Sequence, residues 1–306
     1  MSRQPGPVRL REVIAPRFWP LWAGLGLLRL LIHLPFGAQR GLGRLAGRLM
    51  RRLAPRRAKI VRANIRHCYP TYSPAEVDRL SRAHFESLGI ALFETAQCWW
   101  GSTERLQHQL KAIHGLEHAR AAAAAGQGVI LLSAHFTTLE ISGRLLVQHL
   151  PFAPIYRRMN NPLLEYVTQK GRSKGTQGAI PKDNIKGMIR HLRDGQPIWF
   201  ASDQQRQGSN SALVSFMGHP AHSAIGTSQI ARMGKAAVIP FFAHRSDGGY
   251  VLELGPPLEN FPSADPIADT ERYHRLIEAQ IAHHPEQYLW AHRRFKRAPG
   301  APDYKA

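Results

Sequence analysis

The sequence contains few cysteines and few acidic residues. Its 306 residues include only Cys68 and Cys98, and neither belongs to a C-x-x-C pair. A disulfide framework is therefore excluded, and two packing cysteines fit a reducing compartment. Acidic residues number 21 against 41 Lys and Arg, which leaves a net charge of +20 at pH 7. A strongly basic chain of this kind favours a polyanionic partner.

The signatures of nucleotide, metal and serine-hydrolase chemistry are also missing. No G-x-x-x-x-G-K-[ST] phosphate loop, G-x-S-x-G elbow, H-E-x-x-H motif or Cys/His cluster occurs, despite 16 histidines. The segment GLGRLA at 41–46 resembles a dinucleotide fingerprint, but no predicted strand precedes it. We therefore expect no metal ion and no nucleotide cofactor.

The positive charge is concentrated at the N-terminus. Residues 1–66 contain 15 Lys and Arg and one acid, Glu12. A solvated surface usually mixes both signs, so this segment predicts binding to nucleic acid, anionic lipid or a phosphorylated glycolipid. The basic run has no interleaved aromatic residues for base stacking, and no helix-turn-helix or zinc pattern appears. We therefore expect no nucleic-acid partner, although a membrane-tethered nucleic-acid-binding protein is the alternative from another class.

Residues 18–36, FWPLWAGLGLLRLLIHLPF, form a hydrophobic run that only Arg29 and His33 interrupt. About 20 apolar residues are needed to span a bilayer, and Trp19 and Trp22 suit its interfacial zone. We predict a membrane-anchoring helix over 18–37 and leave open whether it spans or lies on the membrane. A buried core helix is the soluble alternative. A cleavable signal peptide is disfavoured because no A-x-A site follows.

A basic amphipathic helix is predicted directly after this run. Arginines and leucines recur on two faces of one helix, at Arg40, Arg44, Arg48 and Arg52 and at Leu42, Leu45, Leu49 and Leu53. This pattern is typical of helices on a membrane surface. Basic residues after the hydrophobic run favour a cytoplasmic C-terminal domain.

The rest of the chain predicts an α/β fold, a mixed central sheet flanked by helices. Ser73, Pro74 and Glu76 mark the start of a helix over 73–100. From residue 111, short apolar runs alternate with helical stretches. Strands are expected at 129–133, 153–155, 197–202, 236–242 and 250–254, and helices at 116–125, 138–149, 161–172, 183–193, 223–233 and 268–283. We divide the chain into a basic leader (1–17), the membrane-anchoring helix (18–37), a basic helical region (38–110), the α/β domain (111–300) and a tail (301–306).

The segment AHFTTLE at 134–140 carries the strongest candidate for chemistry. The strand 129–133 delivers His135 to the carboxyl edge of the sheet, where α/β domains place their sites. A helix then starts near Thr137 or Thr138, with Glu140 in its first turn. A carboxylate accepting the Nδ1 proton would leave Nε2 of His135 as a general base. The alternative is structural, because Thr137-x-x-Glu140 is also a capping box.

Several stretches resemble one enzyme family. H-x-x-x-x-[DE] after an apolar strand is the signature of glycerolipid-type acyltransferases. More specifically, the chain resembles the lipid A biosynthesis acyltransferases of the Kdo-lipid IVA lauroyltransferase type. The resemblance covers nearly the whole chain, hydrophobic N-terminus included, and is carried by NIRHCYP (64–70), IYRRMNNPLLEYV (155–167), GR (171–172), DNIKGMIRHLRDGQPIWFASDQ (183–204) and HPEQYLWAHRRFK (284–296).

This resemblance implies transfer of a fatty acyl chain, lauroyl or similar, from acyl carrier protein to a hydroxyl of a Kdo-bearing lipid A precursor. It implies an enzyme at the bacterial inner membrane, with its catalytic domain on the cytoplasmic side and no cofactor beyond the acyl carrier protein thioester. His135 would be the general base and Glu140 its orienting partner. A lysophospholipid or other glycolipid acceptor is the alternative within the superfamily.

The resemblance also implies supporting residues. Arg172 would bind a phosphate or a carboxylate such as Glu140, or be an ordinary cation at a helix end. Asp203 would orient Arg172 or the site loop, or be a turn residue. Weaker candidates for the wall of the acceptor groove are Tyr156, Arg157 and Asn161. The acyl-chain length and the acylated position stay open.

Overall fold

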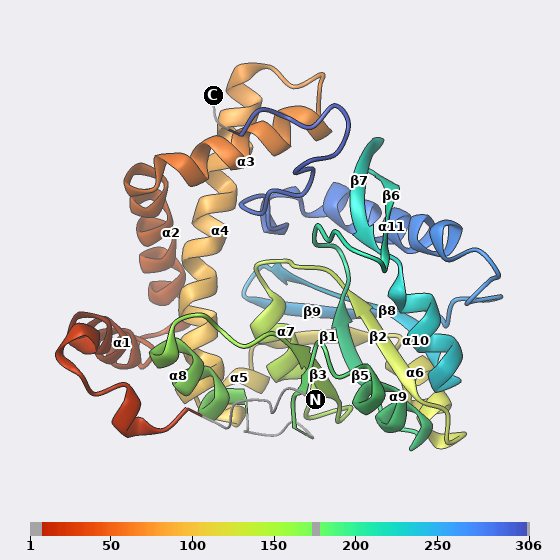
Figure 1. Ribbon diagram of the computed structural model, residues 1–306. Helices are drawn as coiled ribbons and strands as arrows, with labels where there is room; N and C mark the ends of the chain where they lie inside the picture. Colours follow the sequence, from red (N-terminus) through yellow and green to blue (C-terminus); the bar gives the residue numbers. More distant parts are fainter. Residues whose placement is uncertain (1–7, 173–177, 305–306) are drawn as a thin grey trace.

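The computed structural model describes residues 8–172 and 178–304, so the first seven residues of the predicted leader and the last two of the predicted tail lie outside the described residues. A layer of N-terminal helices packs beside an α/β unit (Figure 1). The N-terminal elements are η1 (Leu10–Glu12), η2 (Pro16–Phe18), α1 (Trp19–Leu31), α2 (Phe36–Leu53), α3 (Pro55–Cys68), α4 (Pro74–Trp100) and α5 (Thr103–Gln107).

Helix α4 begins where the sequence predicts. The Ser73 hydroxyl accepts the Glu76 N–H at 3.3 Å, and a Glu76 carboxylate oxygen accepts the Ser73 N–H at 2.8 Å. This capping box satisfies two amides that the first helical turn leaves without partners. At 27 residues, α4 is about 40 Å long. It therefore reaches from the N-terminal helices to the edge of the sheet (Figure 1).

Glycines bring α2 against α4. Gly43 and Gly47 are the buried stripe of α2, together with Gln39. A methyl group on Gly43 would come within 2.7 Å of the Ile90 Cα atom of α4, and one on Gly89 would overlap the α2 backbone. Only glycine permits so close an approach of two helix backbones. The basic helix is thereby fixed to the longest helix of the fold.

The predicted membrane-anchoring helix over 18–37 is not one helix. Helix α1 ends at Leu31, and α2 starts at Phe36 after a tight turn that leads into Pro35, which has no N–H to continue the helix. The side chains of Gln39 and Gln97 both donate to the Ile32 carbonyl in this turn at 2.9 Å. Within the two described ranges, no helix is at once long enough and apolar enough to cross a bilayer. The prediction of one continuous helix over 18–37 is therefore wrong, because this turn divides it into α1 and α2.

The predicted mixed sheet is confirmed. Its strand order is β1-β9-β8-β2-β5-β3-β4, with all neighbours parallel except β8 and β9. The strands are β1 (Leu110–His114), β2 (Val129–Ser133), β3 (Ala153–Tyr156), β4 (Ile180–Pro181), β5 (Ile198–Ala201), β8 (Ala237–Ser246) and β9 (Gly249–Leu254). The predicted strand 129–133 matches β2 at both ends, because five consecutive apolar or small residues are buried on both faces.

Helices cover both faces of the sheet (Figure 1). One core contains Ile130 and Leu132 of β2 with α9, α10 and α11, and the other contains Val129 and Leu131 with α6 and α7. These helices are α6 (Leu116–Ala124), α7 (Leu139–Leu146), α8 (Pro162–Arg172), α9 (Ile185–Arg193), α10 (Gly226–Gly234) and α11 (Pro266–His283), followed by η3 (Pro285–Gln287).

Four strands were not predicted: β1 and β4, the two edge strands of the sheet, and β6 and β7, which form a separate hairpin. The hairpin of β6 (Ser211–Phe216) and β7 (His219–Ala224) turns at Met217 and Gly218, which both have positive φ. The predicted helix at 223–233 therefore starts three residues late, at Gly226. The segment mixes Ser, His and Pro, and it lacks the apolar alternation by which a strand is recognised in sequence.

Candidate active site

The sheet register brings His135 and Asp203 together. Strands β2 and β5 are parallel neighbours, with Ser133 opposite Ala201 at their ends. Two residues farther along each strand, His135 and Asp203 leave the same edge of the sheet. The Ser202 N–H donates to the Ser133 carbonyl at 3.2 Å and keeps the two chains side by side beyond the last ladder pair. This carboxyl edge is where ligand sites of α/β folds lie.

Asp203 fixes the histidine. One of its carboxylate oxygens lies 2.6 Å from His135 Nδ1 and also accepts the His135 backbone N–H at 3.0 Å. The predicted contact between Glu140 and Nδ1 is therefore wrong, because Asp203 occupies that place. Since Nδ1 is engaged, the ring nitrogen left to act on another molecule is Nε2. A histidine held in this way can act as a general base.

Charge pairing sets the protonation of both groups. Burial alone raises the pKa of the Asp203 carboxyl, but the charge and hydrogen bonds of His135 outweigh it and lower that pKa to about 2. Burial lowers the pKa of His135, whereas the Asp203 charge raises it above its ordinary value. Asp203 thus stays ionised at neutral pH, and its charge makes His135 a stronger base.

Glu140 binds Arg172 instead of His135. The α7 helix starts at Leu139, as predicted, and Glu140 lies in its first turn. The Arg172 guanidinium, at the end of α8, donates through Nη2 to one carboxylate oxygen of Glu140 and through Nε to the other. One of the three roles considered for Arg172, a partner for the Glu140 carboxylate, is thus realised. The capping box does not form, because Thr137 and Thr138 bond elsewhere.

His135, Glu140 and Arg172 line one cavity of about 790 Å³. Ligand pockets of enzymes usually fall between about 300 and 1,000 Å³. Besides these charged groups, the lining includes apolar residues from α7, α9, α10 and the sheet with its flanking loops: Leu139, Val147, Phe152, Pro154, Ile155, Met188, Trp199 and Ile230. The cavity therefore suits a ligand with a polar group and a long apolar chain.

Two of the three weaker candidates for the wall of the acceptor groove lie at the cavity, and the third does not. Tyr156 and Arg157 line the cavity, and the Tyr156 hydroxyl donates to Glu165 at 3.1 Å. Asn161 is not among the lining residues. Its side-chain oxygen accepts the N–H groups of Leu163 and Leu164 at 2.9 and 3.2 Å, so it caps α8. This is a structural role at the start of the helix that carries Arg172.

Three residues near Asp203 were not predicted as site residues and enter the sequence analysis only as part of the stretch 284–296. Burial raises the pKa of Tyr288, which also interacts with the Asp203 carboxylate. His292 accepts the Gln205 N–H at 3.2 Å, and burial lowers its pKa to about 4. Arg294 is buried and donates to the His222 carbonyl and the Ser223 hydroxyl at 2.9 and 2.6 Å. No local pattern marks these residues, because the segment reaches the site from the far end of the chain.

No group of three or more His, Cys, Asp or Glu that could bind a metal ion occurs in the part of the chain that the structure describes.

Known proteins are similar to this chain over almost its whole length. The model of the family described as bacterial lipid A biosynthesis acyltransferase matches residues 7–297. The lipid A biosynthesis lauroyltransferase of Escherichia coli (strain K12) is 35% identical, over 95% of this chain and 96% of that protein. The palmitoleoyltransferase of the same organism is 34% identical, over 94% and 95%. Its myristoyltransferase is 27% identical, over 93% and 90%.

Proposed function

The chain belongs to the bacterial lipid A biosynthesis acyltransferases, and we propose that it transfers a fatty acyl group from acyl carrier protein to a hydroxyl of a Kdo-bearing lipid A precursor. The observation that carries this proposal is His135, which bonds Asp203 and lines a cavity of about 790 Å³ together with many apolar side chains. A thioester is already activated for acyl transfer. The proposed reaction therefore uses no metal ion and no cofactor beyond the acyl carrier protein thioester.

His135 would act as the general base. Its Nε2 takes the proton of the acceptor hydroxyl while that oxygen attacks the thioester carbonyl. The tetrahedral intermediate then collapses, the C–S bond breaks, and the proton passes to the sulfur of the carrier. Asp203 stabilises the imidazolium that forms between these two steps, because its carboxylate stays ionised beside Nδ1.

The Glu140–Arg172 pair would orient the acceptor. Both side chains are about a quarter exposed, at 27% each, and both line the cavity. Guanidinium and carboxylate groups on the wall of a cavity are suited to bind phosphate and sugar hydroxyl groups. We propose that the pair sets the position of the glycolipid head, with Tyr156 and Arg157 farther along the same wall.

The apolar part of the cavity would take the acyl chain. Gly143 on α7 lies against Trp199 of β5, and a methyl group on Gly143 would come within 2.5 Å of Trp199 Cζ3. We propose that this contact helps to set the accepted chain, lauroyl or similar. The names of the similar proteins include lauroyl, palmitoleoyl and myristoyl transferases, so we expect the residues at this contact to differ between relatives.

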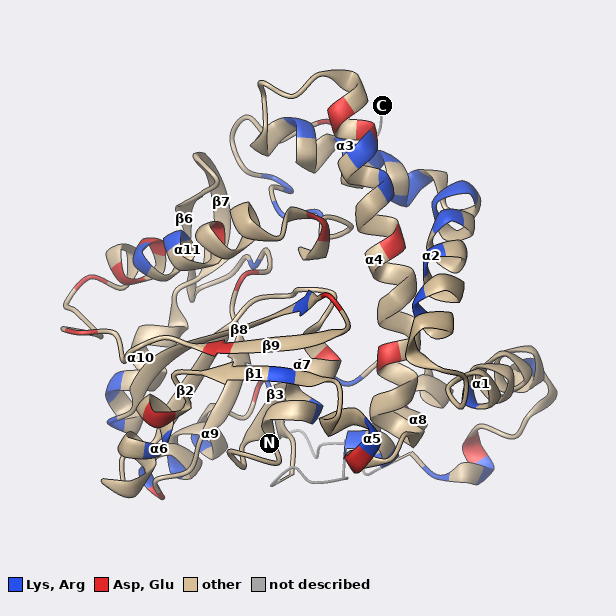
Figure 2. Cartoon of the chain, turned by 180° about the vertical axis from the view of Figure 1, so that it is seen from behind, with Lys and Arg blue, Asp and Glu red and all other residues tan. Residues whose placement is uncertain are grey.

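Helix α2 would lie on an anionic membrane. Lys and Arg residues lie along α2 and α3, and α2 contains no acidic residue (Figure 2). Leu45 and Leu49 are 61% and 53% exposed. Each lies two residues from the buried Gly47, and therefore about 160° around α2 from it. A basic helix with an exposed apolar stripe binds lipid headgroups and acyl chains together. We propose the bacterial inner membrane, with the α/β domain on its cytoplasmic side, and not a nucleic acid.

The same positive region would attract acyl carrier protein, which is acidic. Such long-range attraction raises association rates and weakens as salt increases. The membrane-bound acceptor and the soluble donor would then meet at one cavity.

Mass spectrometry of the reaction mixture tests this function. Purified full-length protein, as wild type or His135→Ala, is given a tetra-acylated Kdo-bearing precursor and a panel of acyl carrier protein thioesters. We expect a mass gain with the wild type and a rate at least 100-fold lower for His135→Ala. The control is His108→Ala, an exposed histidine at the end of α5 that does not line the cavity.

The possible outcomes test the role of His135 and the identity of the acceptor separately. A loss of less than tenfold in His135→Ala contradicts the role of His135. If the precursor stays unmodified while a lysophospholipid is acylated, the acceptor is wrong and the chemistry at His135 stands.

A further inference from the structure

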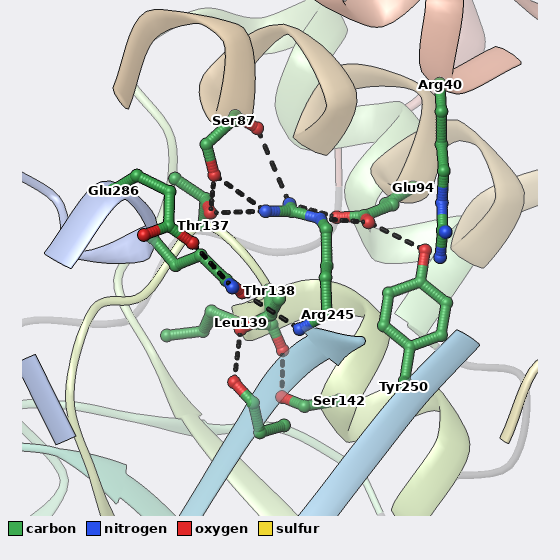
Figure 3. A network of polar contacts seen from close by, with 12 residues as sticks. Arg40, Ser87, Glu94, Thr137, Thr138, Leu139, Ser142, Arg245, Tyr250 and Glu286 are labelled. Carbon is green, nitrogen blue, oxygen red and sulfur yellow. Dashed lines mark hydrogen bonds and ion pairs between the residues drawn. The ribbon is translucent and has the colours of Figure 1, made fainter. Parts of the chain in front are cut away.

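The loop that carries His135 is anchored from three sides. Asp203 bonds the backbone and the ring of His135. From the segment after α11, the Leu289 N–H donates to the His135 carbonyl at 3.0 Å, and the Gln287 carbonyl accepts the Thr137 N–H at 2.7 Å. The third anchor is the Thr137 hydroxyl, which points into a buried polar cluster beside α4 (Figure 3).

Arg245, near the end of β8, is the centre of this cluster (Figure 3). Its Nε and Nη2 each donate to one carboxylate oxygen of Glu94 at 2.6 Å. Its Nη1 donates to the hydroxyls of Ser87 and Thr137 at 2.7 and 2.9 Å, and Nη2 reaches the Ser87 carbonyl at 3.5 Å. A guanidinium has five N–H donors, so each has an acceptor here.

The cluster is closed on its other side as well. The Tyr250 hydroxyl donates to Glu94 at 2.7 Å, and Arg40 of α2 stacks over the Tyr250 ring with its guanidinium carbon 5.6 Å from the ring centroid. The side chains of Arg245 and Glu94 are only 10% and 5% exposed. Helices α2 and α4, two strands and the His135 loop therefore meet in one network of polar contacts.

A gain in stability is a weak explanation for this cluster. Removing two charges from water costs free energy that their attraction often fails to repay, and apolar replacements of similar size are frequently as stable. A bidentate ion pair does, however, impose one geometry. Neither Arg245 nor Glu94 lines the cavity, so any effect on the reaction has to pass through the loop.

We propose that Arg245 and Glu94 are positioning residues, which hold the Thr137 hydroxyl and thereby place His135 for proton transfer. The proposal rests on the acyl transfer proposed above. General bases must lie within about 3 Å of the proton that they abstract. A displacement of about 1 Å at such a site lowers the rate by as much as about 100-fold.

Thr137→Val tests the proposal with little change in volume. We expect kcat to fall about 10- to 100-fold, with the KM values of donor and acceptor changed less than threefold. Thr137→Ser keeps the hydroxyl and is expected to stay within threefold of the wild type in kcat. The matched control is Thr270→Val, which removes another buried hydroxyl, one that donates to the Pro266 carbonyl at 2.7 Å within α11.

Arg245→Lys examines the other end of the contact. The lysine ammonium group has three donors on one nitrogen, so it cannot reproduce the planar guanidinium that bonds Glu94, Ser87 and Thr137 at the same time. We expect kcat to fall as in Thr137→Val, and the double variant to be within threefold of Arg245→Lys, because both changes remove the bond between Arg245 and the Thr137 hydroxyl. Melting temperatures show whether Arg245→Lys still folds. If it does not, the comparison of Thr137→Val with Thr137→Ser tests the proposal.

A second measurement does not depend on acyl transfer. Diethyl pyrocarbonate modifies accessible imidazole nitrogens, and peptide mass spectrometry reads the modification of His135 separately from other histidines. We expect its rate to change at least threefold in Thr137→Val and not in Thr270→Val. The proposal is overturned if Thr137→Val keeps both kcat and this rate, or if Thr137→Ser is equally impaired. A wild type without transferase activity contradicts the proposed function alone.

Discussion

Asp203→Asn removes the carboxylate on which the geometry of the candidate site depends. The side chain is 2% exposed, and one oxygen bonds both the backbone and Nδ1 of His135. The lowering of the Asp203 pKa from 3.8 to about 2 corresponds to ~2 kcal/mol that favour the ionised pair. An asparagine amide can instead donate to Nδ1, which puts the ring proton on Nε2, where the proposed base must be free.

We expect kcat to fall about 10³- to 10⁴-fold in Asp203→Asn. The equivalent change in a serine-protease triad costs about 10⁴-fold, because the histidine is then held in the wrong tautomer. The assay is single-turnover acyl transfer with saturating donor and acceptor, so that binding defects do not enter the rate. The matched control is Asp269→Asn, another buried aspartate, whose carboxylate accepts the Ser263 N–H at about 3 Å far along the chain from the candidate site. It is expected to stay within threefold of the wild type.

The pH dependence of kcat/KM shows which of the two carboxylates, Asp203 or Glu140, acts on His135. A general base works when it is deprotonated, so activity is lost as pH falls through the pKa of His135. Asp203 raises that pKa, and its removal is expected to move the acid limb of kcat/KM to lower pH while the plateau drops. Glu140→Gln should lower the plateau without moving the acid limb, because Glu140 bonds Arg172. A shifted limb in Glu140→Gln with an unchanged limb in Asp203→Asn would refute the assignment.

Three further predictions concern the cavity wall, the helix contact and the membrane surface. Gly143→Val adds methyl groups against Trp199 and should shift the preferred donor to a shorter acyl chain, measured by competition between acyl carrier protein thioesters. Gly43→Ala should lower the free energy of unfolding by about 2 kcal/mol, measured with denaturant, because the new methyl group lies 2.7 Å from the Ile90 Cα atom. Leu49→Glu should reduce binding to anionic vesicles at least tenfold in a sedimentation assay, because it places a negative charge within the apolar stripe.

Gly43→Ala and Leu49→Glu each have a control on the same kind of residue. Gly41→Ala, on α2 with nothing near its new methyl group, should leave stability unchanged or raise it slightly. Leu213→Glu changes a leucine of β6 that is 44% exposed, and it should leave vesicle binding intact. An unchanged donor preference in Gly143→Val would place the acyl chain elsewhere in the cavity. Equal losses of vesicle binding in both leucine variants would contradict the membrane role of α2.

Local sequence was sufficient for elements whose cause is local. The start of α4 follows from Ser73 and Glu76, whose side chains and amides bond each other across one turn. Strand β2 follows from five consecutive buried residues. The helix after His135 begins near Thr138, as predicted. In each case the pattern that predicts the element lies within a short stretch of the chain.

The hydrophobic N-terminal run shows the limit of such patterns. Residues 18–36 have the composition of a membrane helix, but Pro35 and the turn at Ile32 divide them into α1 and α2. Side chains from Gln39 and Gln97 satisfy the carbonyl groups that the turn exposes. Gln97 comes from a helix more than sixty residues away, and no window of the hydrophobic run could reveal it.

By itself, the sequence determined the class of fold, the family and the candidate histidine, because apolar runs, caps and the motif around His135 are all short-range features. Only the tertiary structure decided which carboxylate bonds that histidine. Glu140 is near in sequence, but Asp203 lies 68 residues away and arrives beside His135 because β2 and β5 are neighbours in register. Arg245 and Glu94 meet for the same reason, from a strand and a helix 151 residues apart. Strand order depends on the burial of a whole sheet, and no single segment of the chain encodes it.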